Sequence, residues 1–399
     1  MCLVSQTSGG LVTAITQAWA TYPFLVASAW ERIRARERIV ALGAAGLEDR
    51  DLRRQVLAVL HQVIDFSAYV WLLTDPVTAV GAAPLAEVPC MSELPTLIKA
   101  KYGTPVNRWT AMQLQASPAR LLNNAVGGDL SRSRVWREVM SRYQIGDVAS
   151  AVFADQYGCW GFLDLWRDDA REPFDGMDAE FIVSLAAPLT SALRQCQART
   201  FVEPSTPHRY HAGPVVLTLD EELRITSRTA ASQAWLDLLL PPEPDERAIP
   251  ASVYNVAAQL LAAENGIDDH PAWARTHLAD GFWLTLRAAR LSVEDKPGAL
   301  ARRGATLVVT IEESSAAERL DLFGRCSGLT ARENELLGLL AAGSDTRAMA
   351  RQMFLSEHTI QDHLKSIFAK TGARDRVTVL SRALGTRREA NRSAKNSGW

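Results

Sequence analysis

Sequence patterns that mark common enzyme classes are missing from this chain of 399 residues. It has no Gly-rich phosphate loop, no GxGxxG segment, no HExxH and no GxSxG, so we expect neither catalysis nor a cofactor. Cysteine is scarce and scattered, which excludes a disulfide scaffold and a zinc ribbon and fits a reducing cytoplasm. No CxxC pair occurs among the five cysteines, which are Cys2, Cys90, Cys159, Cys196 and Cys326.

Histidine spacing offers no metal site either. The pairs His208 and His211, and His270 and His277, have no further ligand at the distances along the chain that metal sites commonly use. We therefore expect no bound metal.

Long hydrophobic runs are also lacking. Residues 1–30 carry no charged side chain, but polar residues and Pro23 interrupt the moderately apolar stretch from Leu11 to Trp30. No basic segment precedes that stretch, as a signal or anchor would require. A membrane anchor is the alternative, and the favoured prediction is a weakly ordered extension with no membrane partner.

Charge is distributed unevenly along the chain. From Asp321 to Trp399 there are 13 Lys and Arg against 8 Asp and Glu, a balance of +5, whereas the preceding part has a balance of −7. A basic end on an acidic body predicts a polyanionic partner that is bound by the end of the chain only.

Helix caps follow one another at short intervals near the C-terminus. Thr330 and Glu333 have the spacing of a capping box, and leucines at helical spacing follow them. Gly343 is expected to end this helix. Asp345 and Ser356 are expected to cap a second, short helix and a third helix.

The third helix has two distinct faces. Ile360, Leu364 and Ile367 recur at helical spacing and predict one buried stripe, whereas Gln361, Asp362, Lys365 and Ala369 fall on the opposite side. Gly372 is expected to end the helix. A short helix, a tight turn and an amphipathic helix together predict a trihelical unit of the helix-turn-helix kind, whose second helix enters the DNA major groove.

This segment resembles the LuxR-type helix-turn-helix regulators. The residues that carry the resemblance are Leu329-Thr330-x-Arg332-Glu333, Gly343, Ala350, Ser356-x-x-Thr359-Ile360-x-x-His363, Ile367, Lys370, Gly372 and Arg376. The family usually has Ser, Glu and Leu where this chain has Asp345, Ala348 and Thr371, and Asp345 keeps the cap. The alternative is a small helical interaction module without affinity for DNA.

The resemblance and the helix faces together suggest DNA contacts. Gln361, Asp362 and Lys365 are the candidates for base edges, because amide, carboxylate and ammonium groups match base donors and acceptors. Asp362 has an alternative partner in Lys365, and His363 has an alternative place under the helix. The candidates for phosphate contacts are Thr346, Arg347, Thr359, His363 and Lys370.

The first half of the chain shows the pattern of an α/β domain. A helical pattern at 52–63 precedes a strand at 66–73, and two strands at 147–154 and 159–166 form a predicted hairpin. A long helix at 177–194 follows, with Pro188 as a predicted kink. This order of elements resembles the GAF sensory fold.

A second small domain is predicted after a proline-containing linker. Strands are expected at 214–219 and 224–227, a helix at 230–240, and three strands at 272–278, 282–289 and 305–312. This order resembles a PAS domain. A helical connector is expected at 316–323.

Several aromatic side chains and one cysteine of the first domain are candidates for a ligand pocket. Aromatic residues are more often plain core, and a single cysteine in a strand is more often an inert buried side chain. Cys159 is the candidate for a chromophore or oxidant site. The candidate aromatic residues are Trp71, Trp109, Trp136, Trp160 and Trp166.

These observations predict a multidomain α+β chain in which GAF-like and PAS-like sensory domains precede an all-α LuxR-type domain. The predicted segments are an uncharged extension at 1–34, the GAF-like domain at 35–202, a linker at 203–213, the PAS-like domain at 214–314, a connector at 315–326, the helix-turn-helix domain at 327–385 and a basic disordered tail at 386–399.

The predicted function is a cytoplasmic, sequence-specific DNA-binding transcriptional regulator that its sensory half controls. Expected partners are double-stranded DNA, a second copy of the chain on that DNA and an unidentified small molecule, with RNA polymerase as a further candidate. The alternative is a ligand-independent regulator whose sensory half serves only dimerisation or the binding of partner proteins.

Overall fold

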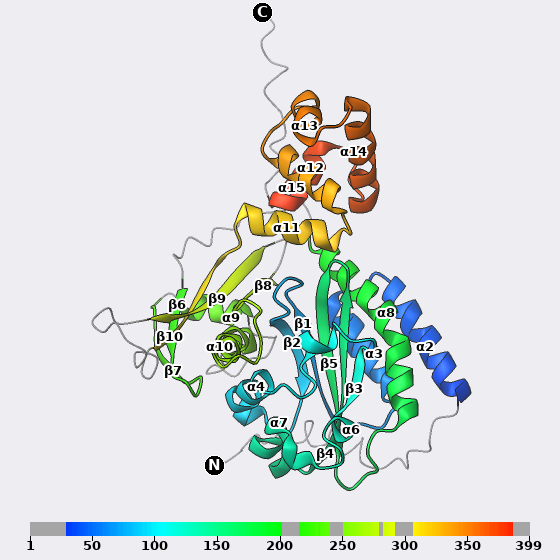
Figure 1. The fold of residues 1–399 in the computed structure, drawn as a ribbon, viewed down its shortest axis with the longest axis vertical. Helices are drawn as coiled ribbons and strands as arrows, with labels where there is room; N and C mark the ends of the chain where they lie inside the picture. The colour runs from blue at the N-terminus through cyan, green and yellow to red at the C-terminus, as the bar shows by residue number, and fades with distance from the viewer. Residues whose placement is uncertain are drawn as a thin grey trace, which may run out of the picture.

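A computed structural model describes residues 29–201, 215–230, 232–239, 250–278, 282–291 and 306–385. Figure 1 shows two units built on β-sheets, with a smaller helical unit above them. The predicted multidomain α+β organisation is therefore confirmed. The predicted linker at 203–213, the tail at 386–399 and most of the extension at 1–34 lie outside the described residues.

The first sheet unit contains a five-stranded antiparallel sheet in the order β2-β1-β5-β4-β3. The predicted strand and hairpin are present as β1, β4 and β5, while β2 and β3 were not predicted. The strands are β1 (Ala68–Thr74), β2 (Gly81–Glu87), β3 (Ala119–Leu121), β4 (Ile145–Asp155) and β5 (Gly158–Asp168).

A layer of helices covers one face of this sheet. In this layer the long helix α8 (Gly176–Arg199) packs on β4, and α2 (Ala29–Ala44) packs on α8. Helix α2 begins inside the segment predicted as an extension. The remaining elements are α3 (Asp49–Leu60), η1 (Met91–Glu93), α4 (Leu94–Tyr102), α5 (Trp109–Met112), α6 (Leu122–Ala125), η2 (Leu130–Arg132), α7 (Arg134–Glu138) and η3 (Met140–Tyr143).

Alternation along the strands divides the side chains of the sheet between two cores. Trp71 and Leu163 belong to the cluster under α8, together with Leu189. Their neighbours in the two strands, Leu72 and Phe162, belong to the cluster that reaches the second sheet unit. This division follows from the two-residue period of a strand.

The second sheet unit has a five-stranded antiparallel sheet in the order β7-β6-β10-β9-β8. All five of its strands were predicted, but its longer helix, α10, was not. The elements are β6 (Val215–Leu219), β7 (Ile225–Arg228), α9 (Ser232–Leu239), α10 (Ala251–Glu264), β8 (Trp273–His277), β9 (Trp283–Leu291) and β10 (Thr306–Glu313).

A buried ion pair connects the two sheet units to the helix that follows them. Arg275 of β8 binds Asp75 of the β1–β2 loop through two nitrogens, at 2.6 and 3.1 Å. Its remaining nitrogen reaches Asp321 of α11 (Ala316–Cys326) at 3.0 Å. The side chains of Arg275 and Asp75 are 1% and 0% exposed, so this bridge is shielded from solvent.

The helical unit contains one helix beyond the connector and the three helices that the sequence predicts. Helix α15 follows the expected three, is capped by Asp375, and buries Val379 and Ala383. It packs on α11, which spans the two sheet units in Figure 1. Besides α11 and α15 (Arg376–Leu384), the unit comprises α12 (Ala331–Ala341), α13 (Thr346–Met353) and α14 (Glu357–Thr371). Among the described residues, no helix has the length and apolar character that crossing a membrane requires.

Candidate nucleic-acid interface

The first helix of the interface, α12, is fixed at its start by a capping box. The hydroxyl of Thr330 accepts from the backbone N–H of Glu333, and the Glu333 carboxylate accepts from the backbone N–H of Thr330. The same carboxylate also accepts from Ser366 and Lys370 of α14, both at 2.6 Å. One buried carboxylate therefore caps α12 and attaches α14 to it.

These contacts determine the protonation of Glu333. Burial opposes its ionisation, but the hydrogen bonds from Lys370, Ser366 and Thr330 outweigh it and lower the pKa of Glu333 to about 2. The carboxylate is therefore charged at neutral pH, as an ion pair with Lys370 requires.

The turn between α13 and α14 has the geometry of a helix-turn-helix. Asp345 caps α13 by accepting from the N–H of Ala348 at 2.7 Å, and Ser356 caps α14 by accepting from Thr359 at 3.1 Å. Phe354 ends α13 in the left-handed conformation, with φ of 56°. Its side chain is 94% exposed, so burial of the ring does not explain this conformation.

The faces of α14 are divided as the predicted stripe requires. Ile360, Leu364 and Ile367 are buried against the other helices, being at most 1% exposed. The three residues predicted at base edges, Gln361, Asp362 and Lys365, are exposed. An outward face of α14 is thus open to a partner.

Asp362 and Lys365 are not independent of one another. The Lys365 ammonium lies 2.9 Å from Asp362 Oδ1, and His358 Nε2 lies 3.6 Å from the other oxygen. The hydrogen bond and charge of Lys365 lower the pKa of Asp362. The structure thus pairs Asp362 with Lys365, the partner that the sequence offered as an alternative to a base.

The five residues predicted at phosphates fall into different surroundings. Arg347 is exposed, Thr359 shares a hydrogen bond with Ser356, and His363 is half-buried. The hydroxyl of Thr346 accepts from Arg376 at 2.9 Å, which places an arginine that was not predicted at this surface. Arg376 belongs to the family resemblance, and that was the signal that could have found it.

Lys370 has a structural role that the prediction did not include. Its ammonium is held by Glu333 at 2.6 Å and joins α12 to α14. Glu333 neutralises this ammonium and occupies one of its three N–H donors, so a phosphate at Lys370 would compete with Glu333. Arg347 is therefore the better candidate for a phosphate contact in this conformation.

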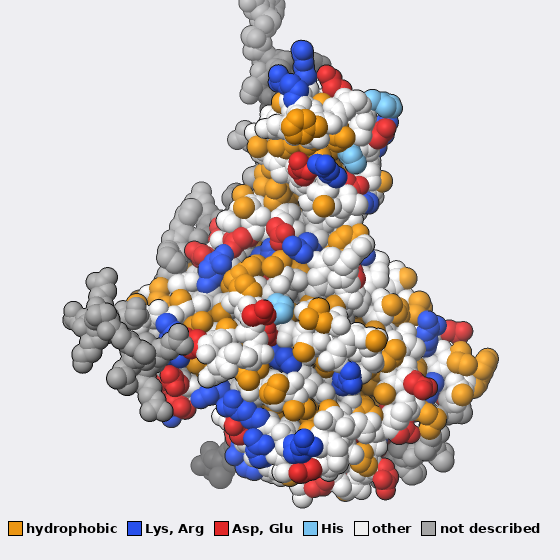
Figure 2. All heavy atoms as spheres, viewed as in Figure 1, with side chains coloured by type: hydrophobic (Ala, Val, Ile, Leu, Met, Phe, Trp, Pro, Cys, Tyr) orange, Lys and Arg blue, Asp and Glu red, His pale blue; other side chains and the backbone are white. Residues whose placement is uncertain are grey.

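The surface of the helical unit carries charges of both signs. In Figure 2, basic, acidic and histidine side chains alternate with hydrophobic ones on the upper part of the molecule. This face is not uniformly basic, so its affinity for DNA has to come from particular contacts as well as from net charge.

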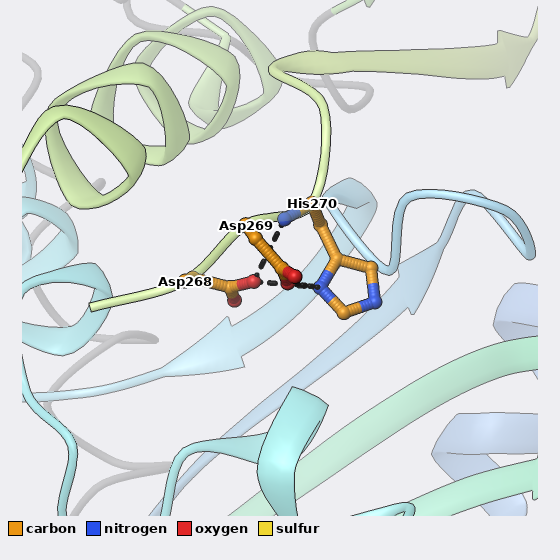
Figure 3. Close-up of side chains that lie close together, drawn as sticks. All are labelled: Asp268, Asp269 and His270. Atoms are coloured by element: carbon orange, nitrogen blue, oxygen red, sulfur yellow. Dashed lines mark hydrogen bonds and ion pairs between the residues drawn. The ribbon is translucent and has the colours of Figure 1, made fainter. Parts of the chain in front are cut away.

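One cluster of acidic residues and histidine lies outside the helical unit. Figure 3 shows Asp268 and Asp269 directed toward Nδ1 of His270, at 2.6 and 3.6 Å. Their donor atoms have the spacing of metal ligands. The other oxygen of Asp268, however, is bound by Arg108 and Thr110, both at 2.7 Å. The cluster thus has a role without a metal, because Arg108 attaches the first sheet unit to the second.

The aromatic candidates of the first sheet unit are separated by the fold. Trp71 and Trp160 lie in the core under α8, and Trp136 donates to the carbonyl of Ile145. Trp109 stacks on Phe162, with ring centroids 4.5 Å apart. Of the five candidates, Trp166 lines a cavity on the other face of the sheet.

Cys159 lacks the surroundings of a reactive thiol. It is 2% exposed, and burial raises the pKa of Cys159 to about 11. A thiol of this kind stays protonated at neutral pH and is a poor nucleophile.

Comparison with known families identifies the helical unit. Residues 327–383 match the family described as "Bacterial regulatory proteins, luxR family". The Klebsiella aerogenes monoamine regulon transcriptional regulator is 41% identical over 54 residues, which are 14% of this chain and 24% of that protein. The Mycobacterium tuberculosis DNA-binding transcriptional activator DevR/DosR is 42% identical over 57 residues, or 14% and 25% of the two chains.

A longer match is found with the probable HTH-type transcriptional regulator GfsR of Streptomyces halstedii. It is 32% identical over 98 residues, which are 25% of this chain and 40% of that protein. The chain thus spans between a quarter and two fifths of the length of these curated relatives.

Similarity to solved structures is weaker. The crystal structure of Escherichia coli SdiA aligns with 89% of this chain and 97% of its own, at 12% identity and a TM-score of 0.31. A TM-score that low does not establish a shared fold. The sequence matches are more specific, since they name families of transcriptional regulators and not of enzymes. Most of the helical unit, residues 327–383, therefore matches the luxR family of bacterial regulatory proteins.

Proposed function

We propose that the chain is a sequence-specific DNA-binding transcriptional regulator whose sensory half controls the helical unit. The observation that carries this proposal is the outward face of α14, where Gln361 and Lys365 are exposed above a fully buried stripe. In a helix-turn-helix, the second helix lies in the major groove.

Base recognition would come from a few side chains of this helix. Gln361 can bond adenine through its amide, and Lys365 can donate to guanine. Asp362 would either accept from a cytosine or hold Lys365 in place through their ion pair. A second copy of the chain would bind the adjacent half-site, because such units commonly read DNA as dimers.

Control by the sensory half would act through α11. Arg275 and Asp321 attach this helix to the second sheet unit, and Arg325 donates to the carbonyl of Tyr157 in the β4–β5 turn of the first. We assign GAF-like and PAS-like character to the two sheet units on the order of their elements. A signal in either unit would shift the population of α11 orientations and so the spacing of two helical units on DNA.

Binding of the full chain to duplex DNA at a series of salt concentrations tests the function. We expect the logarithm of the affinity to fall with the logarithm of the salt concentration, with a slope of about −0.9 per neutralised phosphate. Selection from random duplexes should then yield a preferred sequence. A full chain that binds no duplex DNA at low salt would contradict the proposal.

A further inference from the structure

The outward face of α14 includes a histidine that was not among the predicted DNA contacts. His358 lies in the first turn of this helix, three residues before Gln361 and four before Asp362. Lys365 follows it at seven residues, and side chains at these spacings lie on one face of a helix. The side chain of His358 is 85% exposed, so a partner outside the chain can reach it.

The carboxylate of Asp362 lies between this histidine and Lys365. Its Oδ1 is 2.9 Å from the Lys365 ammonium, and its Oδ2 is 3.6 Å from Nε2 of His358. The hydrogen bond and charge of Lys365 lower the pKa of Asp362, and the charges of His358 and His363 act in the same direction. The cluster of His358, Asp362 and Lys365 is therefore uncharged overall while the imidazole is neutral, and positive once it is protonated.

The carboxylates of the neighbouring helices do not compete for the His358 ring. Among the described residues, Asp362 is its only ion-pair partner. Helix α14 packs on α12, α13 and α15, and the carboxylates of these helices, Glu333 and Glu335, bind Lys370 and Arg332 instead. The charged residues of the three helices are Arg332, Glu333 and Glu335 of α12, Arg347 and Arg351 of α13, and Arg376 and Arg382 of α15.

A histidine at the start of a recognition helix has the chemistry for reading bases. The N-terminal residues of such a helix contact base edges, and guanine presents N7 and O6 as acceptors in the major groove. A protonated imidazole has two N–H donors, whereas a neutral one has a single donor. The negative charge of DNA favours the protonated ring, so binding through His358 takes up a proton and strengthens as the pH falls.

We propose that His358 is a base contact of the recognition helix in its protonated form, and that it makes sequence preference depend on pH. Asp362 would hold His358 and Lys365 side by side on the outward face before DNA is bound. This inference rests on the proposed DNA-binding function and adds a proton to what controls it.

The preference for the selected sequence is the quantity that tests the inference. It is the ratio of the affinities of the full chain for the preferred duplex and for a random duplex, measured by fluorescence anisotropy at one salt concentration. We expect it to be about threefold to tenfold higher at pH 6 than at pH 8, the effect of one hydrogen bond. Taking the ratio removes the pH dependence of phosphate contacts, which both duplexes share.

His358→Gln removes the titrating ring and keeps a polar side chain. Its preference should be equal at pH 6 and pH 8, and its melting curve should match that of the unmodified chain because the side chain is exposed. His358→Arg carries donors at both pH values, so its preference should stay high at pH 8. A preference that still depended on pH in either variant would overturn the inference, because the titrating group would then lie elsewhere.

His363→Gln is the matched control, since His363 is the other histidine of α14 and is half-buried. This variant should keep the pH dependence of the preference even if it weakens binding to both duplexes. Loss of that dependence in His363→Gln would assign it to His363 and overturn the inference. An unmodified chain with the same preference at pH 6 and pH 8 would overturn this inference and leave the proposed function standing, whereas a chain that binds no DNA would overturn both.

Discussion

The helical unit and the two sheet units are stabilised by contacts of different range along the chain. In the helical unit, the capping hydroxyls of Thr330 and Ser356 accept from backbone N–H groups only three residues further along the chain. Between the sheet units, Arg275 binds Asp75 across 200 residues. The difference means that the helical unit can be inferred from short sequence windows, whereas the junction of the sheet units cannot.

The two regions also differ in the exposure of their important polar groups. Gln361 and Lys365 are exposed on α14, where a partner outside the chain can reach them. The partners Arg275 and Asp75 are fully buried and serve the fold. Substitutions on the outward face of α14 should therefore change DNA binding, whereas substitutions at the buried bridge should change the free energy of unfolding.

The largest effect is expected at the buried bridge. Arg275→Ala removes the guanidinium and leaves the carboxylate of Asp75 buried without its counterion, which typically costs about 3–5 kcal/mol. Chemical denaturation of the full chain should show this loss. The control is Arg224→Ala, which removes an exposed pair with Asp220 and should leave the transition unchanged. Equal transitions for both variants would mean that the bridge does not connect the units.

A similar loss, confined to the helical unit, is expected at its core. Leu364→Ala should destabilise that unit by roughly 2–5 kcal/mol, because the leucine is 1% exposed and its removal leaves a cavity. Circular dichroism should show the helical unit melting earlier. Ala369→Ser, on the exposed side of α14, is the control. An unchanged melting curve for Leu364→Ala would reverse the assignment of the helix faces.

Acid should act on the helical unit through Glu333. Its pKa in the folded chain, about 2, lies below the ordinary value of 4.5, so the folded state holds the proton less tightly than the unfolded state. The stabilisation is therefore complete above pH 4.5 and is lost as the pH falls toward 2, by at most about 3 kcal/mol.

Melting of the helical unit between pH 7 and pH 2.5 measures this dependence. Glu333→Gln should flatten it, while Glu335→Gln, which alters an exposed pair with Arg332, should not. If Glu333→Gln melted with the same pH dependence as the unmodified chain, the acid response would come from other carboxylates.

The smallest effect concerns recognition of bases. Lys365→Ala should weaken binding to the preferred sequence by about 1–3 kcal/mol and leave binding to random duplexes nearly unchanged. Arg347→Ala, at the better candidate for a phosphate contact, is expected to weaken binding to both and reduce the salt slope by about one. Lys370→Ala should instead destabilise the unit, since it leaves Glu333 without its counterion. Equal losses on both duplexes for Lys365→Ala would make Lys365 a phosphate contact.

For two of the elements of the sheet units that escaped prediction, β2 and α10, the reason can be identified. The strand β2 contains Pro84 and few residues that favour strands. The proline is tolerated because β2 is an edge strand, which does not need every backbone N–H for pairing. The helix α10 is buried nearly all round, so no polar face marks its period in the sequence.

The sequence by itself determined the helical unit: the caps, the buried stripe of α14 and its outward face. These features arise from contacts within one helical turn, so their residues recur at short fixed intervals. Only the tertiary structure decided that Lys370 pairs with Glu333, that Arg275 bridges Asp75 and Asp321, and that Asn255 donates to the carbonyl of Gly81. Such contacts depend on the path of the chain between distant residues, and no local periodicity records that path.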